Sequence, residues 1–155
     1  MTEEQALSRL AALCSQAEHC IADMTRRLNQ WGISPDVQQR IIDYLIREGY
    51  IDERRYCRCL IEEKIRYNGW GRRKIEQALY AKQIDRQISQ KALDEVPDDA
   101  YAEVLRPLLQ QKWHTISAQS DYERSMKLIR WAMGRGYDYE IIKTCTDHLS
   151  TLPDD

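Results

Sequence analysis

Residues 24–45 read MTRRLNQWGISPDVQQRIIDYL and contain the pattern that decides the fold: an apolar helical turn, a break at Gly32 and a second apolar helix. Adding 51 or 104 to these numbers finds two further copies, at residues 75–96 and 128–149. Seven positions of each copy fall into register from these two offsets, and in the first copy they are Met24, Leu28, Gly32-Ile33, Val37, Ile41 and Leu45. Such spacing is typical of one supersecondary unit stacked several times. It favours recognition over a long surface rather than a single catalytic pocket.

Helical periodicity extends along nearly the whole chain. Apolar residues return at three- and four-residue spacing, and strand-like alternation is almost absent. We therefore predict an all-α protein of nine helices, built as three tandem three-helix repeats that form an elongated, curved array. The predicted repeats are residues 1–50, 51–97 and 98–150, followed by a disordered tail at residues 151–155. Ser15 with Glu18 has the capping-box spacing, which predicts that the second helix begins there.

The charge is unevenly distributed, although the formal net charge is only −2. The segment from Arg54 to Lys91 holds eleven Lys or Arg and four Asp or Glu, so it carries +7 and the rest of the chain −9. This polarity indicates an anionic partner at the middle repeat, although a solvated helical face has the same composition. The candidate binding face consists of nine cations: Arg54, Arg55, Arg58, Lys64, Arg66, Arg72, Arg73, Lys74 and Lys82.

Two features of this basic segment strengthen the binding hypothesis. Arg72, Arg73 and Lys74 open a predicted helix, where cations oppose the helix dipole but free N–H groups attract an anion such as phosphate or carboxylate. Trp70 lies between the two basic groups and could stack on a base or fill a partner pocket. The alternative for Trp70 is a core position at a repeat junction.

No motif in the sequence indicates catalysis, a cofactor or a metal. Cys57 and Cys59 are the only close cysteine pair, and on a helix they point about 200° apart, which suits no shared metal. His19, His114 and His148 are scattered, and the chain has neither a glycine-rich phosphate loop nor a Gly-x-Ser-x-Gly elbow. We predict a protein that is not an enzyme and needs no cofactor.

The cysteine count, the N-terminal residues and the length of the apolar runs together predict the cellular compartment. The five cysteines are odd in number, the N-terminus is acidic where a secretory leader would be basic, and no apolar run approaches the ~20 residues of a membrane span. We expect a cytoplasmic protein with free thiols and no membrane partner.

Three stretches, at residues 47–56, 69–75 and 130–142, together resemble the RecX family of bacterial recombination regulators. Residues 47–56, REGYIDERRY, resemble the family's turn from its first repeat into its second. Residues 69–75, GWGRRKI, with Leu79 and Lys82, are similar to its most typical motif, and residues 130–142 resemble its third-repeat turn and helix. Gln83 stands where the family usually has glycine.

The resemblance implies a small helical modulator of RecA without chemistry of its own. Such proteins lie in the groove of the RecA–DNA filament and interfere with filament growth, ATP hydrolysis and strand exchange, within DNA repair, recombination and the SOS response. The implied partner is the RecA filament, with single- or double-stranded DNA as a further contact, and we expect a monomer. Two alternatives stay open: a helical protein that binds nucleic acid directly without RecA, since three-helix units resemble helix-turn-helix modules in outline, and an adaptor for another protein.

Overall fold

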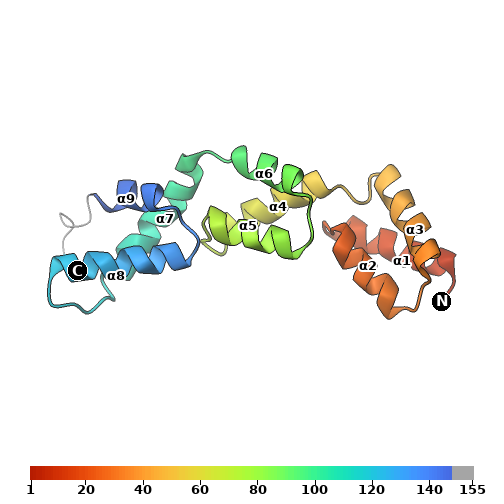
Figure 1. Cartoon of the computed structure of the whole chain (residues 1–155), viewed down its shortest axis with the longest axis horizontal. Helices are drawn as coiled ribbons and strands as arrows, with labels where there is room; N and C mark the ends of the chain where they lie inside the picture. The colour runs from red at the N-terminus through yellow and green to blue at the C-terminus, as the bar shows by residue number, and fades with distance from the viewer. Residues whose placement is uncertain (148–155) are drawn as a thin grey trace. The chain divides into compact units, whose positions relative to one another are not determined.

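The computed structural model describes residues 1–147, and this part of the chain consists of nine α-helices without a strand (Figure 1). The helices are α1 (Glu3–Gln16), α2 (Ile21–Gln30), α3 (Pro35–Arg47), α4 (Glu53–Arg66), α5 (Arg72–Ala81), α6 (Arg86–Asp94), α7 (Asp98–Trp113), α8 (Asp121–Gly134) and α9 (Tyr139–Thr146). The predicted all-α class is confirmed. The predicted tail at residues 151–155 lies outside the described residues.

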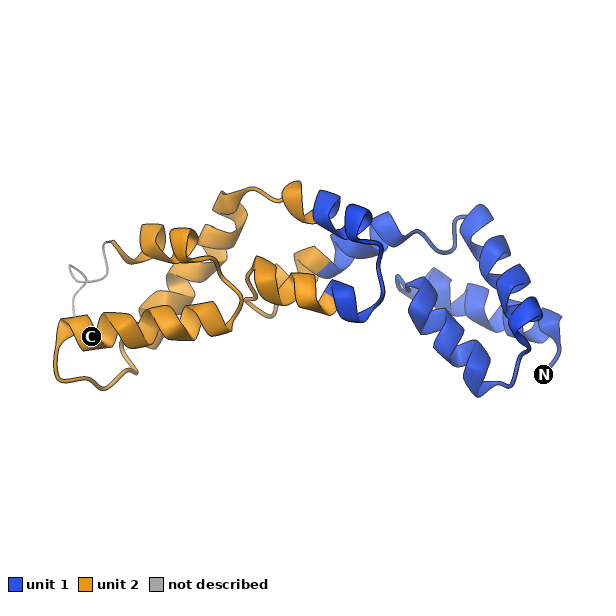
Figure 2. Cartoon of the chain, viewed as in Figure 1, with its two compact units in different colours: residues 1–60, 79–92 blue, residues 61–78, 93–155 orange. Residues whose placement is uncertain are grey.

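Contacts divide the chain into two compact units (Figure 2). The first unit comprises residues 1–60 and 79–92, and the second comprises residues 61–78 and the chain from residue 93 onward. Helices α1 to α3 therefore belong to the first unit and α7 to α9 to the second, while the division falls within α4, α5 and α6. The three repeat boundaries predicted from the sequence stay a prediction.

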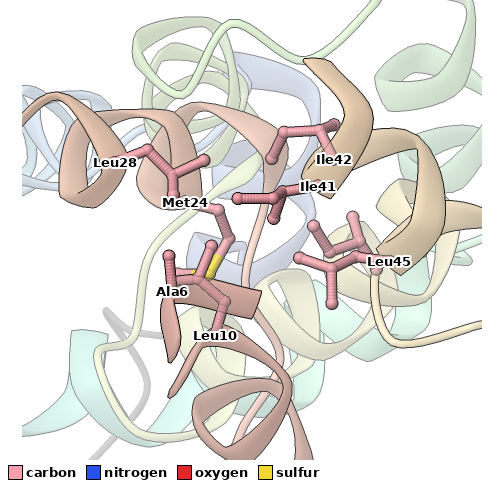
Figure 3. Close-up of a cluster of buried hydrophobic side chains, with 8 residues drawn as sticks. Ala6, Leu10, Met24, Leu28, Ile41, Ile42 and Leu45 are labelled. Carbon is pink, nitrogen blue, oxygen red and sulfur yellow. The ribbon is translucent and has the colours of Figure 1, made fainter. Parts of the chain in front are cut away.

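The core of the first unit gathers apolar side chains from α1, α2 and α3. Helix α3 packs against both α1 and α2, and Figure 3 shows the side chains converging from all three helices. The cluster consists of Ala6, Leu10, Met24, Leu28, Ile41, Ile42, Leu45 and Ile51, none of them more than 6% exposed. Ile51 follows α3, and the other members recur at three- and four-residue spacing, so each helix turns one apolar stripe inward. Burying each large side chain contributes about 1.5–3 kcal/mol.

The repeated break has one backbone geometry in all three copies. Gly32, Gln83 and Gly136 have φ of +72°, +59° and +97°, in the left-handed region. The N–H of the following residue donates to a carbonyl five residues back in each copy: Ile33 to Leu28 (3.1 Å), Ile84 to Leu79 (3.3 Å) and Tyr137 to Ala132 (3.3 Å). These bonds belong to the Schellman motif, which ends a helix with a left-handed residue. Gln83 thus keeps the turn although it is not glycine.

The predicted start of the second helix at Ser15 is wrong. Helix α1 continues to Gln16, and the Ser15 hydroxyl donates to the Ala11 carbonyl at 2.9 Å inside that helix. Glu18 completes no capping box, because Ser15 lies inside α1 and is not an N-cap, and the Glu18 carboxylate accepts instead from Arg55. The capping box of this region lies at the start of α1, where Thr2 and Gln5 bond reciprocally.

In the second unit, α7 packs against both α8 and α9, and α8 against α9. The shared core includes Tyr101, Leu105, Leu109, Leu128, Ala132, Ile142 and Cys145. Pro107 lies inside α7, which continues through it. Among residues 1–147, every helix is too short or too polar to cross a membrane.

Candidate partner-binding site

The loop of residues 67–71, between α4 and α5, is fixed by backbone pairing with the turn between α8 and α9. The Gly71 N–H donates to the Arg135 carbonyl at 2.9 Å, and the Arg73 N–H donates to the Gly136 carbonyl at 3.0 Å. A Cβ on Gly71 would lie 2.4 Å from the Gly136 carbonyl carbon, and one on Gly136 would lie 2.6 Å from the Lys74 backbone nitrogen. Only glycine at both positions permits two backbones to approach this closely.

Two side chains from the turn between α8 and α9 also donate hydrogen bonds to the loop of residues 67–71. The Arg135 guanidinium donates to the Gly69 carbonyl at 3.1 Å and also to the Asn68 carbonyl. The Tyr137 hydroxyl donates to the Gly69 carbonyl at 3.0 Å, and burial raises the pKa of Tyr137 to about 12, so this donor stays protonated. The carbonyls of Asn68 and Gly69 therefore have fixed partners, which hold the loop against the turn between α8 and α9.

This loop presents Trp70 together with two lysines. The Trp70 backbone N–H donates to the Lys64 carbonyl at 3.0 Å. The Lys64 and Lys74 ammonium nitrogens lie 4.9 Å and 4.6 Å from the centroid of the Trp70 ring, both within cation–π range. We call Lys64, Trp70 and Lys74 the Lys–Trp cluster. Its half-buried ring positions two positive charges beside one aromatic surface, which suits an anionic ligand.

Three further predicted cations of the second unit have acidic partners. Arg66 pairs with Glu62 at 3.5 Å. Arg72 pairs with Asp94 at 2.6 Å, and Arg73 pairs with Asp138 at 3.0 Å. Exposed pairs of this kind contribute about 0–1 kcal/mol, and the side chains of Arg66 and Arg73 are each 68% exposed. These two arginines can therefore exchange their partners for a ligand at little cost.

The candidate binding face includes cations of the first unit, of which some form ion pairs with acidic side chains and others do not. Arg55 donates to Glu18 and to the Gly49 and Tyr50 carbonyls. Lys82 pairs at 2.9 Å with an aspartate of α2. Arg54 and Arg58 are exposed, and within residues 1–147 their side chains have no ion pair.

Sequence reasoning missed the acidic partners and the supports of the loop. Asp23, Asp94 and Asp138 lie 59, 22 and 65 residues from their cations, so no local pattern indicates these pairs. The sequence does draw attention to Arg135 and Tyr137, because they flank Gly136, the break residue of the third copy.

The cysteines form no metal centre in the described part of the chain, where no group of three or more His, Cys, Asp or Glu side chains could hold an ion. Cys57 is buried and Cys59 is exposed, as expected for opposite sides of α4. Burial raises the pKa of Cys57 to about 11, so its thiol is protonated and unreactive at neutral pH.

Two family models match the chain. They describe the second three-helix domain of RecX, at residues 52–93, and the third, at residues 99–146, which together cover more than half of the 155 residues. The chain is 26% identical to the regulatory protein RecX of Lactobacillus johnsonii over 95% of its own length, and it spans 54% of that relative. It is 25% identical to the regulatory protein RecX of Vibrio parahaemolyticus, with 84% of this chain and 82% of the relative covered.

Solved structures show the same fold. The crystal structure of RecX from Lactobacillus salivarius superposes with a TM-score of 0.88 at 21% identity, covering 97% of both chains. A second structure, of a regulatory protein RecX, gives a TM-score of 0.85 at 19% identity over 94% of this chain and 73% of its own. The all-α fold of tandem three-helix domains is thereby confirmed, and the curated relatives are named regulatory proteins. On the family models, the curated relatives and the shared fold together, the chain belongs to the RecX family.

Proposed function

We propose that this chain binds the RecA–DNA filament and inhibits RecA in recombination and DNA repair. The observation that carries the site is the Lys–Trp cluster on its doubly clamped loop. The membership of the RecX family supports the partner. The protein acts by binding and not by catalysis, and it works without a cofactor. Its compartment is the cytoplasm, because the filament forms there on chromosomal DNA.

The mechanism follows from where the cations lie. The Lys–Trp cluster and the exposed Arg66 and Arg73 present positive charge on α4, α5 and the loop between them. They meet carboxylates of RecA protomers or phosphates of the DNA, which their hydrogen-bonding geometry suits equally. Tandem helical units contact neighbouring protomers together, and this raises avidity without a deep pocket. The bound protein then obstructs filament growth and protomer movement.

RecA-dependent ATP hydrolysis and strand exchange test the function. We expect substoichiometric protein to lower both rates, because one bound copy obstructs several protomers. Unchanged rates at every ratio would refute the proposed function.

Reversing the charge of the two lysines in the Lys–Trp cluster tests the site. The variant K64E/K74E should bind RecA–DNA filaments at least 10-fold more weakly, because reversing two charges at the interface should remove at least about 1.4 kcal/mol of attraction. The matched control R9E/R27E reverses two exposed arginines of α1 and α2 and should bind within about 3-fold of wild type. Equal weakening by both variants would show that net charge, not the cluster, governs binding. Circular dichroism melting of each variant checks the fold.

A second candidate function, direct binding of single-stranded nucleic acid, is favoured by Tyr67. This side chain is 84% exposed in the clamped loop, next to Arg66 and three residues before Trp70. Exposed aromatic rings among cations stack on bases and contribute about 1–3 kcal/mol each. Binding to bare single-stranded DNA with a steep salt dependence, lost in Y67A and unaffected by RecA, would favour this function over the first.

A further inference from the structure

Helix α8 carries an exposed apolar stripe that the core of its unit does not use. Tyr122, Met126 and Met133 are 77%, 37% and 43% exposed, and Ile129 is half-buried. Relative to Tyr122 the other three follow at 4, 7 and 11 residues, which places all four within about 60° of one another around the helix. The buried Leu128 and Ala132 lie about 90–130° around the helix from the centre of this stripe, and α8 packs against α7 and α9 (Figure 1).

The order of residues in this stripe is self-complementary. When a second α8 lies antiparallel about the helix centre, Tyr122 faces Met133 of the other copy, and Met126 faces Ile129. The spacing of 4, 3 and 4 residues is that of a coiled-coil seam. Met and Tyr side chains suit such a contact because thioether groups pack adaptably against aromatic rings.

The charges that flank the stripe follow the same symmetry. Glu123 and Arg130 are seven residues apart, so they lie on the same flank. In an antiparallel pair each flank faces its own equivalent, and Glu123 of each copy therefore faces Arg130 of the other. Glu123 also pairs with Lys127 of its own helix at 3.3 Å, whereas Arg130 makes no ion pair within residues 1–147. Two reciprocal ion pairs are thus available to a second copy.

We propose that α8 is a self-association surface, on which a second copy of this chain packs antiparallel through Tyr122, Met126, Ile129 and Met133. The 14 residues of α8 span about 21 Å at 1.5 Å per residue. One helix face buries less than the roughly 1,200–2,000 Å² of a stable interface, so the association is weak and becomes visible only at high protein concentration. The monomer expected from the sequence is the dilute form.

Sedimentation equilibrium of the full chain from micromolar to near-millimolar concentration tests the proposal. The weight-average mass of the wild type should rise from 18.4 kDa toward twice that value. The variant M126E/M133E should keep the monomer mass throughout. The control I46E, which alters a 44% exposed side chain of α3, should behave like the wild type. A wild-type mass that stays at 18.4 kDa, or an M126E/M133E variant that associates normally, would overturn the proposal.

A charge exchange tests the antiparallel register. The variants E123R and R130E should each self-associate at least 10-fold more weakly, because each places like charges opposite one another. An equimolar mixture of the two should associate like the wild type, since every arginine then faces a glutamate. A mixture that associates no better than the separate variants would refute the register, and circular dichroism melting of both confirms that they fold.

Discussion

Substituting Gly71 with alanine tests the clamp that positions the loop of residues 67–71. The new Cβ would lie 2.4 Å from both the Gly136 carbonyl carbon and the Tyr137 nitrogen, and 2.5 Å from the Gly136 carbonyl oxygen. All three are backbone atoms, so no side chain can rotate away. The two segments must separate, and the hydrogen bonds from the Gly71 and Arg73 N–H groups, 2.9 Å and 3.0 Å long, stretch with them.

The size of the effect follows from these contacts. Overpacking of a close contact costs about 1–3 kcal/mol, and each of the two weakened hydrogen bonds contributes about 0.5–1.5 kcal/mol. We therefore expect Gly71→Ala to lower the free energy of unfolding by about 2–6 kcal/mol. For a chain of this length each kcal/mol corresponds to roughly 2–4 °C in Tm.

Urea denaturation followed by tryptophan fluorescence measures this change. The matched control is Gly134→Ala in α8, because a Cβ there meets nothing within 4 Å and alanine favours the helix by up to about 1 kcal/mol. The reasoning fails if the two variants unfold within about 0.5 kcal/mol of each other. Filament binding by Gly71→Ala should also weaken, because the displaced loop carries Trp70.

Three further predictions concern the first unit and α4. Gln83→Gly should raise the free energy of unfolding by about 0.5–1 kcal/mol in urea denaturation, because φ of +59° strains a residue with a Cβ, and an unchanged or lower value would contradict this. Desolvation opposes the ionisation of Asp23, yet the hydrogen bond from Lys82 holds its pKa below the usual 3.8. Asp23 therefore adds stability above that pH which is lost as the pH falls through its folded pKa, and urea midpoints between pH 2 and 6 should vary less in D23N than in the wild type. In a C14S background, which removes the half-buried free Cys14, an aromatic disulfide reagent at pH 8 should modify the exposed Cys59 fast and the buried Cys57, of pKa about 11, only on unfolding, so a fast phase that persists in C14S/C59S would contradict this assignment.

The apolar pattern was sufficient to predict the fold because it is local and repeated. Each copy needs only three- and four-residue spacing around a break to specify two helices and the turn between them. The three left-handed break residues, Gly32, Gln83 and Gly136, were all located from the sequence. The start of α2 was not, because α1 continues through Ser15 to Gln16 and the Glu18 carboxylate accepts from Arg55, 37 residues away.

The candidate site could be predicted only in part, because its charges pair over long distances. From the sequence, Lys82 and Arg66 are equal candidates for binding an anionic partner. The structure pairs Lys82 with the largely buried Asp23, whereas Arg66 reaches only Glu62 on its own helix, in a pair exposed to solvent on both sides. A count of charges therefore overestimates how many cations a ligand can use.

The clamped loop gives the proposed site at the Lys–Trp cluster an advantage over cations on a free helix surface. A lysine on a free helix surface loses conformational entropy when it binds a partner, but Lys64 and Lys74 already lie against one ring that the loop holds in place. Part of the conformational entropy of these side chains is thus lost during folding and not during binding. Preorganisation raises affinity in this way. It follows that the glycines of the clamp should influence binding as strongly as the lysines, although Gly71 and Gly136 carry no group that could contact a ligand. A Gly136→Ala variant that binds RecA–DNA filaments like the wild type, while its loop is displaced, would show that the cluster does not depend on this preorganisation.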